Sequence, residues 1–305
     1  MMLSRVVELV ITFIKIYTAL DAVIVDLDSD EAIPETMKWV QDVDPQLERE
    51  FLDLLYEEKW KVLQRFPNEN VTVYWTKSKS YSNRELFLLA TETRHEKDVL
   101  SDALWIEAYQ LGKWSRMFSD SKILSYAGRN RAVFWQELEP VVPGGFVAPR
   151  DYVIYSKKID NAQVPSSTRK PVSPVDGLLG SAGLVTSSSI NENSNGSTMF
   201  LSCNSSKYGI DFPSRDGVVR AVTGTAGSIL RTYLDEDGRP VTRFWWILNS
   251  ENYPPMFTPM SVARRVVLKT MMDMVRDLRR FLHHQQLREL QADASSVPAA
   301  PSPII

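Results

Sequence analysis

The segment Ala148–Lys158 reads APRDYVIYSKK, and its pattern decides how the rest of the chain is interpreted. Tyr152–Tyr155 is a run of aromatic and β-branched residues, which favour a pleated, half-buried strand. Arg150 and Asp151 stand at the beginning of that strand, either as a solvated strand end or as charges directed toward an interior. The segment therefore predicts a strand whose first residues carry polar chemistry.

Other strands are predicted on both sides of this segment. Arg131–Glu139 (RAVFWQELE) places Val133, Trp135 and Glu137 on one face, and the turn sequence VVPGG leads from it to the segment above. The two strands are therefore expected to be neighbours. Further strands are predicted at 71–77, 84–93, 198–203, 217–224, 227–234 and 241–249, the last two joined by a hairpin turn at DEDGRP.

Three helices are predicted around these strands. The first covers Asp44–Phe66 and begins with an Asp-Pro capping pair, and a shorter one covers 97–114. The last covers 258–284, with a basic stripe of Arg265, Lys269, Arg276 and Arg280 beside an apolar one. The apolar stripe comprises Val267, Met271, Met274, Leu278 and Phe281, with Leu282 beside it. This order of elements predicts an α+β fold, a curved antiparallel sheet wrapped around a long C-terminal helix.

Three segments have a different character. Residues 1–25 carry Arg5, Glu8 and Lys15 on one helical stripe, which favours an amphipathic segment on the domain or on a membrane surface over a transmembrane helix. A cleavable targeting role for this segment stays open. Residues 161–197 are rich in Ser, Pro, Gly and Asn and predict a flexible insertion. The folded domain is expected to cover 44–290, and residues 291–305 to form a disordered tail.

The composition excludes several classes of protein. A formal net charge of -3 and 44% hydrophobic residues indicate a domain with a real core, without the basic field of a nucleic-acid binder. Cys203 is the only cysteine, and the three histidines, His95, His283 and His284, lack metal-ligand spacing. We therefore expect no metal and no cofactor, and no catalytic triad can be argued. Acid–base chemistry with Glu137 is the open enzymatic alternative.

Four stretches, in their order along the chain, resemble the START lipid-transfer domains, which have the helix-grip fold. They are VFWQELEP (133–140), PRDYVIY (149–155), DGVVRA (216–221) and RFWWILNSENYPPMFTPMSVARRVVLKTMMDMVRDLRRFL (243–282). The resemblance extends from about Asp44 to Leu282. It implies an internal hydrophobic tunnel that holds one lipid and is covered by the C-terminal helix.

The resemblance also implies site residues, but it does not select one lipid class. Glu137 falls where sterol-binding relatives have a cavity acid, whose usual basic partner is replaced here by Ser156. Trp135 and Tyr152 match two aromatic residues with which the phosphatidylcholine-binding relative surrounds choline, and the third position is Gly224. Each pattern therefore lacks one member, and phospholipid is slightly favoured over sterol.

The remaining candidates lie at two places in the chain. Arg150 and Arg220 are candidate contacts to the lipid headgroup, with a structural role as the alternative for each. Met271, Met274, Leu278 and Leu282 match apolar positions that line the tunnel in relatives. Methionine suits such a position because its flexible, polarizable side chain adapts to different lipid shapes.

The expected function is intracellular, cytoplasmic lipid binding and transfer by a monomer that is not an enzyme. Its partners would be a single lipid ligand and, transiently, a membrane surface, with no nucleic acid. The C-terminal helix would gate the tunnel. The alternatives are a lipid-sensing regulatory or interaction module and, less favoured, an enzyme on the same fold.

Overall fold

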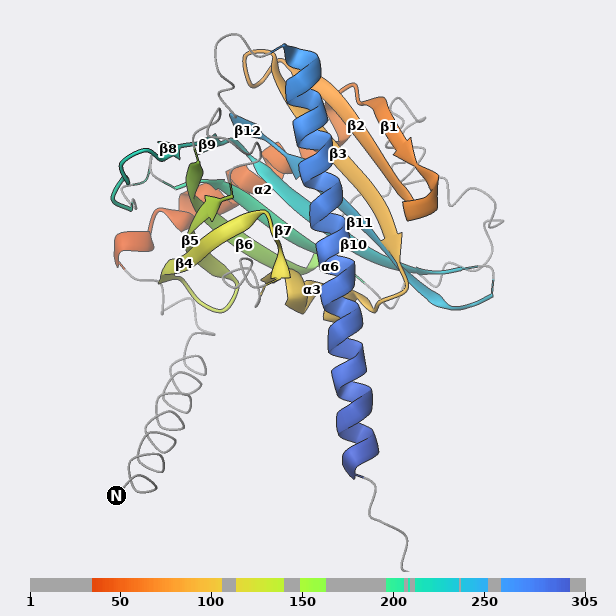
Figure 1. Cartoon of the computed structure of the whole chain (residues 1–305). Helices are drawn as coiled ribbons and strands as arrows, with labels where there is room; N and C mark the ends of the chain where they lie inside the picture. Colours follow the sequence, from red (N-terminus) through yellow and green to blue (C-terminus); the bar gives the residue numbers. More distant parts are fainter. Residues whose placement is uncertain are drawn as a thin grey trace, which may run out of the picture.

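A computed structural model describes residues 35–105, 114–139, 149–162, 196–205, 208, 212–235, 237–251 and 259–296 (Figure 1). The expectations for 1–25, for 163–195 of the insertion and for 297–305 of the tail fall outside the described residues. The described elements are, in chain order, η2 (Glu35–Met37), α2 (Val40–Glu57), β1 (Lys61–Phe66), η3 (Pro67–Glu69), β2 (Val71–Ser78), β3 (Arg84–Thr93), α3 (Lys97–Trp105), β4 (Phe118–Tyr126), β5 (Arg131–Leu138), β6 (Arg150–Ala162), β7 (Ser197–Asn204), β8 (Val219–Arg220), β9 (Val222–Thr223), β10 (Ala226–Leu234), β11 (Pro240–Leu248), β12 (Ser250–Glu251) and α6 (Met260–Ser296).

Within these ranges ten strands form one sheet. Nine of them follow the order β1-β2-β3-β11-β10-β7-β6-β5-β4 with antiparallel neighbours, and the short β8 pairs in parallel with the start of β6. A second, two-stranded sheet joins β9 and β12. The predicted α+β architecture is therefore confirmed, with β5 and β6 as antiparallel neighbours.

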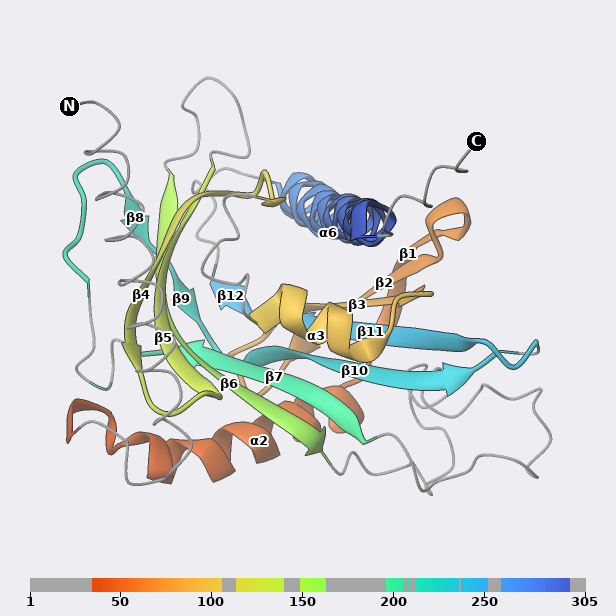
Figure 2. The same ribbon diagram turned by 90° about the horizontal axis from the view of Figure 1, so that it is seen from below.

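The sheet separates two layers of helix. In Figure 2, α2 lies against one face of the sheet, whereas α3 and α6 lie on the opposite side, toward which β4, β5 and β6 curve. We call the face packed against α2 the outer face and the face turned toward α3 and α6 the inner face. Because side chains alternate along a strand, each strand contributes to both.

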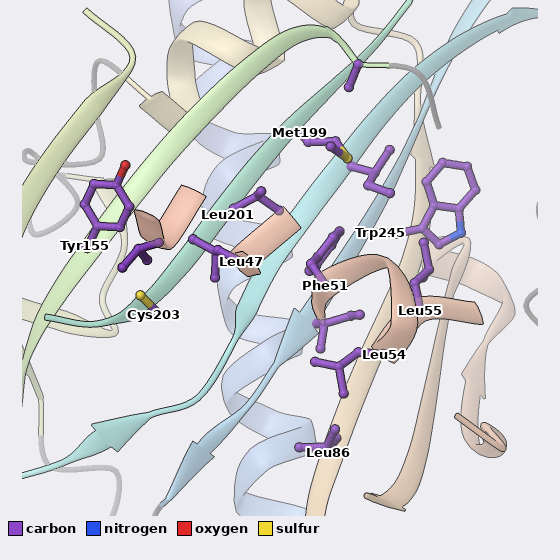
Figure 3. Packing of buried hydrophobic residues seen from close by; sticks show 14 of the residues in the cluster. Leu47, Phe51, Leu54, Leu55, Leu86, Tyr155, Met199, Leu201, Cys203 and Trp245 are labelled. Atoms are coloured by element: carbon purple, nitrogen blue, oxygen red, sulfur yellow. The ribbon is translucent and has the colours of Figure 1, made fainter. Parts of the chain in front are cut away.

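Apolar side chains fill the space between α2 and the outer face. Figure 3 shows Leu47, Phe51, Leu54 and Leu55 of α2 directed at side chains of the sheet. The outer-face partners labelled there are Leu86, Tyr155, Met199, Leu201, Cys203 and Trp245. Asp44 adds a buried polar link, since its carboxylate accepts hydrogen bonds from Tyr155 (2.6 Å) and Arg131 (2.8 Å). These contacts fix α2 to β5 and β6.

The prediction of one helix over Asp44–Phe66 is wrong at both ends. The helix α2 begins at Val40, so that Asp44 lies within it, and residues 61–66 form β1 instead. The pairing of β1 with β2 shifts register between Val62 and Gln64, and this bulge places Leu63 and Phe66 on the same side. A spacing of three between apolar residues imitates the period of a helix.

The C-terminal boundary and one strand also differ from the expectation. The helix α6 continues to Ser296, into the segment predicted as a tail, because its last turns are built from strong helix formers such as Leu, Glu, Gln and Ala. The strand β4 was not predicted, and its alternation is interrupted by two register shifts against β5. Of the segment 161–197, the first two residues belong to β6 and the last begins β7.

Candidate functional site

The register of β5 against β6 decides which predicted site residues meet. Gln136 is paired with Tyr152 and Leu138 with Arg150, and Leu138 packs into the apolar cluster under α6. These residues therefore lie on the inner face. Trp135 is paired with Val153 and Glu137 with Asp151, and Trp135 belongs to the cluster under α2. The structure thus brings Arg150 and Tyr152 together and separates both from Trp135 and Glu137.

The outer-face residues form a network around the carboxylate of Asp151. Trp135 Nε1 donates a hydrogen bond of 2.8 Å to Asp151 Oδ2, and the guanidinium of Arg220 donates to both carboxylate oxygens at 2.8 and 3.0 Å. Arg220 also donates to the carbonyl oxygen of Phe212. Burial alone would raise the pKa of Asp151, but the hydrogen bonds from Arg220 and Trp135 hold this pKa below its ordinary value. Arg220 is therefore placed as a structural partner of β6.

The aromatic ring and the cations around Trp135 also lie on the outer side of the sheet, away from α6. Its indole packs against Phe212 with ring centroids 4.8 Å apart, and the cations of Lys122 and Arg215 lie 5.4 and 5.9 Å from its ring. Glu137 forms an ion pair with Arg215. The electron-rich face of Trp135 is therefore already in contact with cations of the protein itself.

A polar group forms where β6 begins on the inner face. The hydroxyl of Tyr152 shares a 2.8 Å hydrogen bond with the hydroxyl of Ser250 in β12. Burial raises the pKa of Tyr152, while the hydrogen bond with Ser250 and the positive charge of Arg150 oppose this rise. Gln136 lies beside Tyr152 in the register and is also buried. Arg150, Gln136 and Tyr152 thus place one cation and several hydrogen-bonding groups together.

Apolar side chains beyond this polar group keep contact with solvent. Ile154 on β6, and Trp246 and Leu248 on β11, are only half-buried although their strands lie inside the sheet. They share the inner face with Val267 and Leu268 of α6, which are half-buried as well. Protein interiors are normally close-packed. These half-buried side chains therefore leave apolar surface incompletely packed on the inner face.

The four predicted residues of α6 lie on the side that faces the sheet. Met271, Met274, Leu278 and Leu282 are all buried in the inner-face cluster. That cluster also contains side chains of several strands and of the segment before β4, among them Val73, Phe87, Leu89, Trp114, Phe200, Leu230 and Phe244. The apolar stripe is thus packed as the sequence predicts, whereas its contact with a lipid stays a prediction.

Sequence reasoning missed several residues of the inner face. Gln136, Ile154, Ser250, Trp246 and Leu248 were not among the candidates, although Gln136 and Ile154 stand in the same two motifs as Trp135 and Tyr152. Alternation from Tyr152 finds Ile154 and Ser156 directly. Gln136 can be found only with the register of β5 against β6, because a shift of one residue exchanges the two faces.

The described residues show neither a metal-binding cluster nor a membrane-spanning helix. No group of three or more His, Cys, Asp or Glu side chains in the described ranges is arranged to hold a metal ion. None of the helices that the structure describes combines the length and apolar character needed to cross a membrane.

Known proteins resemble this chain in structure and not in sequence. No family model and no curated protein sequence matches it. Among solved structures, human StAR-related lipid transfer protein 5 matches with a TM-score of 0.57 and 12% identity, over 81% of this chain and 98% of that one. Human STARD10 matches with a TM-score of 0.49 and 12% identity, over 78% and 82% of the two chains. The STAR-related lipid transfer protein of Xanthomonas axonopodis has a TM-score of 0.49 and 15% identity, over 74% and 99%.

Of these three matches, the first has a TM-score above 0.5. At 12% identity it shows the fold alone. The match covers 98% of that chain, and in this chain it includes the curved sheet with the long helix α6 across its inner face. The chain therefore has the helix-grip fold of the START domains.

Proposed function

We propose that the protein binds one lipid on its inner face, beneath α6, and transfers it between membranes without changing it chemically. The observation that carries this proposal is the partial exposure of Ile154, Trp246 and Leu248 on that face, the last two in the same apolar cluster as Val267 and Leu268 of α6. Lipid chains would complete the packing there, and each buried CH₂ group contributes about 0.8 kcal/mol. The structural match to a protein named for lipid transfer supports the same function.

The charges on the inner face favour a phospholipid over a sterol. Along β5 and the first half of β6, the acids Glu137 and Asp151 face outward, and the inward residue Arg150 is a cation. A phosphate group gains strongly from a guanidinium, whereas the single hydroxyl of a sterol gains only an ordinary hydrogen bond. We therefore propose that Arg150, Tyr152 and Gln136 contact the headgroup. Trp135, Glu137 and Arg220 are not part of this proposed site.

The first turn of α6 is the proposed contact with the membrane. Met260 and Val262 are 50% and 45% exposed, and Arg265 and Lys269 are exposed nearby. Exposed apolar side chains beside cations suit an anionic lipid surface. We propose that this contact is transient and that the protein acts as a monomer in the cytoplasm.

A lipid sensor that retains its ligand is the second candidate. The observation in its favour is that ion pairs attach α6 to β3 and to η3, through Arg264 with Glu85 and Arg276 with Glu69. A helix held in this way would release a lipid slowly. Transfer and sensing differ in rate, since a sensor binds tightly with little exchange.

Vesicle transfer assays test the proposal. Donor vesicles carry fluorescent phosphatidylcholine or a fluorescent sterol, and the initial transfer rate is measured against protein concentration. We expect phosphatidylcholine transfer proportional to protein, slowed about tenfold or more in Arg150→Gln because a charge-assisted hydrogen bond to phosphate is lost. Arg65→Gln removes an equal charge from an exposed position on β1 and serves as the matched control. We expect it to change the rate by less than about twofold.

The possible outcomes separate the parts of the proposal. Sterol transfer without phospholipid transfer would contradict the assignment of the headgroup but leave lipid transfer standing. Tight phospholipid binding with no exchange would favour the sensor. Failure to bind either lipid would contradict the proposed function as a whole.

A further inference from the structure

The helix α6 is packed unequally along its length. From Met271 to Leu282 the inward Met, Val and Leu side chains are buried, with Met271 and Leu282 at 0% and 1% exposure. In the ten residues before Met271 the inward side chains Val267 and Leu268 are only half-buried. We call Met260–Lys269 the front part of α6 and Met271–Leu282 the anchored part. Apolar burial holds the anchored part more strongly than the front part.

Polar contacts reinforce the anchored part. Asp277 is buried, and it accepts hydrogen bonds from the backbone N–H of Arg116 at 2.9 Å and from the Arg116 guanidinium. Arg279 donates to the hydroxyl of Thr91 on β3 at 2.8 Å. The ring of Phe281 stacks on that of Trp114, with centroids 5.7 Å apart. Contacts to β3 and to the segment before β4 thus hold this part from two sides.

The front part has a different attachment. Arg264 donates two hydrogen bonds to Glu85 of β3, at 2.9 and 2.6 Å, and its guanidinium lies 4.0 Å from the ring centre of Trp75 on β2. The side chain of Glu85 is 9% exposed and that of Arg264 is 29% exposed, so that solvent screens this pair only in part. Among the polar contacts of the described residues, this bidentate pair is the link between the front part and the sheet.

The amino-acid sequence of the front part also favours local opening of the helix there. Val262, Val266 and Val267 are β-branched and have low helix propensity, whereas the anchored part contains one such residue, Val275. At the junction, Thr270 Oγ1 donates a 3.0 Å hydrogen bond to the carbonyl oxygen of Val266. This type of bond, from a threonine to the carbonyl one turn earlier, weakens and often bends a helix. The junction is therefore suited to act as a hinge.

We propose that lipid enters and leaves through opening of the front part of α6 alone, about a hinge at Thr270, and that the Arg264–Glu85 pair is the latch. The anchored part remains on the sheet during the exchange. This inference rests on the proposed function, because it names the route to the inner face. The half-buried residues of that face, Trp246 and Leu248, share the inner-face cluster with Val267 and Leu268.

The test compares two arginines of α6 that each pair with a glutamate. Arg264→Ala removes the latch, and Arg276→Ala removes the pair with Glu69 in the anchored part. Amide hydrogen exchange is measured without lipid, separately for 262–269 and for 272–282. Transfer of phosphatidylcholine is measured between uncharged vesicles, so that loss of a surface charge does not itself change the rate. Arg264→Lys, which keeps the charge and loses the bidentate geometry, is a milder variant in case Arg264→Ala does not fold.

We expect Arg264→Ala to speed both exchange in 262–269 and phosphatidylcholine transfer by about fivefold to tenfold, with 272–282 unchanged. Arg276→Ala should change either rate by less than about twofold. The double variant with Arg264→Glu and Glu85→Arg should recover part of the wild-type behaviour. Equal acceleration of exchange in both parts of α6 would overturn the proposal in favour of release of the whole helix. If Arg276→Ala changed exchange in 262–269 and phosphatidylcholine transfer as much as Arg264→Ala does, the assignment of the Arg264–Glu85 pair as the latch would be wrong.

The exchange measurement also separates this inference from the proposed function. Faster exchange confined to 262–269 in Arg264→Ala, with no lipid transfer by any variant, would support the opening of the front part and contradict lipid transfer. Normal transfer by Arg264→Ala, with exchange unchanged in 262–269, would support lipid transfer and contradict the latch.

Discussion

Trp135 and Asp151 are joined on the outer face of the sheet by a 2.8 Å hydrogen bond from the indole Nε1 to Oδ2. Asp151 is adjacent in sequence to Arg150, yet the register of β6 directs these two residues to opposite faces. The charged pair at the start of this strand therefore has two separate roles. Asp151 orders the outer face with Trp135 and Arg220, and Arg150 supplies the cation of the inner face.

Replacement of Trp135 should affect stability and not lipid affinity. Trp135→Phe removes the indole donor and leaves the buried carboxylate of Asp151 with fewer hydrogen bonds. We expect the free energy of unfolding in urea to fall by about 1–3 kcal/mol. Lipid affinity, measured by fluorescence titration with vesicles, should stay within about twofold of wild type. A large loss of affinity in a folded Trp135→Phe protein would place Trp135 in the lipid site after all.

The pH dependence of stability should report on Asp151. Its pKa in the folded protein is lowered, so the charged carboxylate stabilises the fold above the pKa of an unfolded aspartate, about 3.9. This contribution is lost as the pH falls through the lower pKa of the folded state. Urea midpoints of the wild type and of Asp151→Asn should therefore differ by a constant amount at pH 5–7 and converge below about pH 4. A difference that stays constant down to pH 3 would contradict this assignment.

The buried Asp277 should be the strongest polar anchor of α6. Its side chain is 0% exposed, whereas its partners Arg116 and Arg280 are 66% and 52% exposed and would remain solvated without it. Asp277→Asn should lower the free energy of unfolding by about 1.5–3 kcal/mol, the range for hydrogen bonds to a charged group. Arg280→Gln, which alters an exposed partner, should cost less than about 1 kcal/mol. Equal losses in the two variants would show that Asp277 does not anchor the helix.

Filling the inner face should block lipid uptake without unfolding the protein. Ile154→Trp adds bulk at a half-buried position on the inner face of β6. We expect lipid binding to fall by about tenfold or more while the melting temperature changes by only a few degrees, because the native side chain is only half-buried and overpacking is most costly in a closely packed core. Thr72→Trp introduces the same ring on the outer face of β2, where the native residue is also half-buried, and should bind lipid normally.

Unchanged lipid uptake by a folded Ile154→Trp protein would remove the inner face of β6 from the proposed site. Loss of uptake in both tryptophan variants would point to general destabilisation instead. The melting temperatures of the two variants distinguish these results.

Local patterns in the sequence predict most of the architecture. The β3 range of 84–93 is as predicted, and the α6 stripe of Met271, Met274, Leu278 and Leu282 faces the sheet. These features depend on the alternation of a strand or the period of a helix, both of which are visible in one segment. The strand β1 was missed because the bulge at Val62 and Gln64 imitates helical spacing.

The faces of the site residues depend on information that a single segment does not contain. Motif position suggests Trp135 and Glu137 as inner residues, but the pairing of β5 with β6 places their neighbours Phe134 and Gln136 there. Similarly, Trp245 and Trp246 must face opposite sides, yet only the packing in three dimensions shows that Trp245 lies under α2 and Trp246 under α6. Strand register is a long-range property, and a shift of one residue reverses the result.

Native mass spectrometry of the intact protein shows whether the inner face beneath α6 holds one lipid. The protein would be purified from a eukaryotic host, sprayed intact, and any lipid that remains bound identified after release. We expect one lipid per chain, a phospholipid, which is absent from Ile154→Trp prepared in the same way. A folded wild-type protein without bound lipid, and without uptake from mixed liposomes, would contradict it.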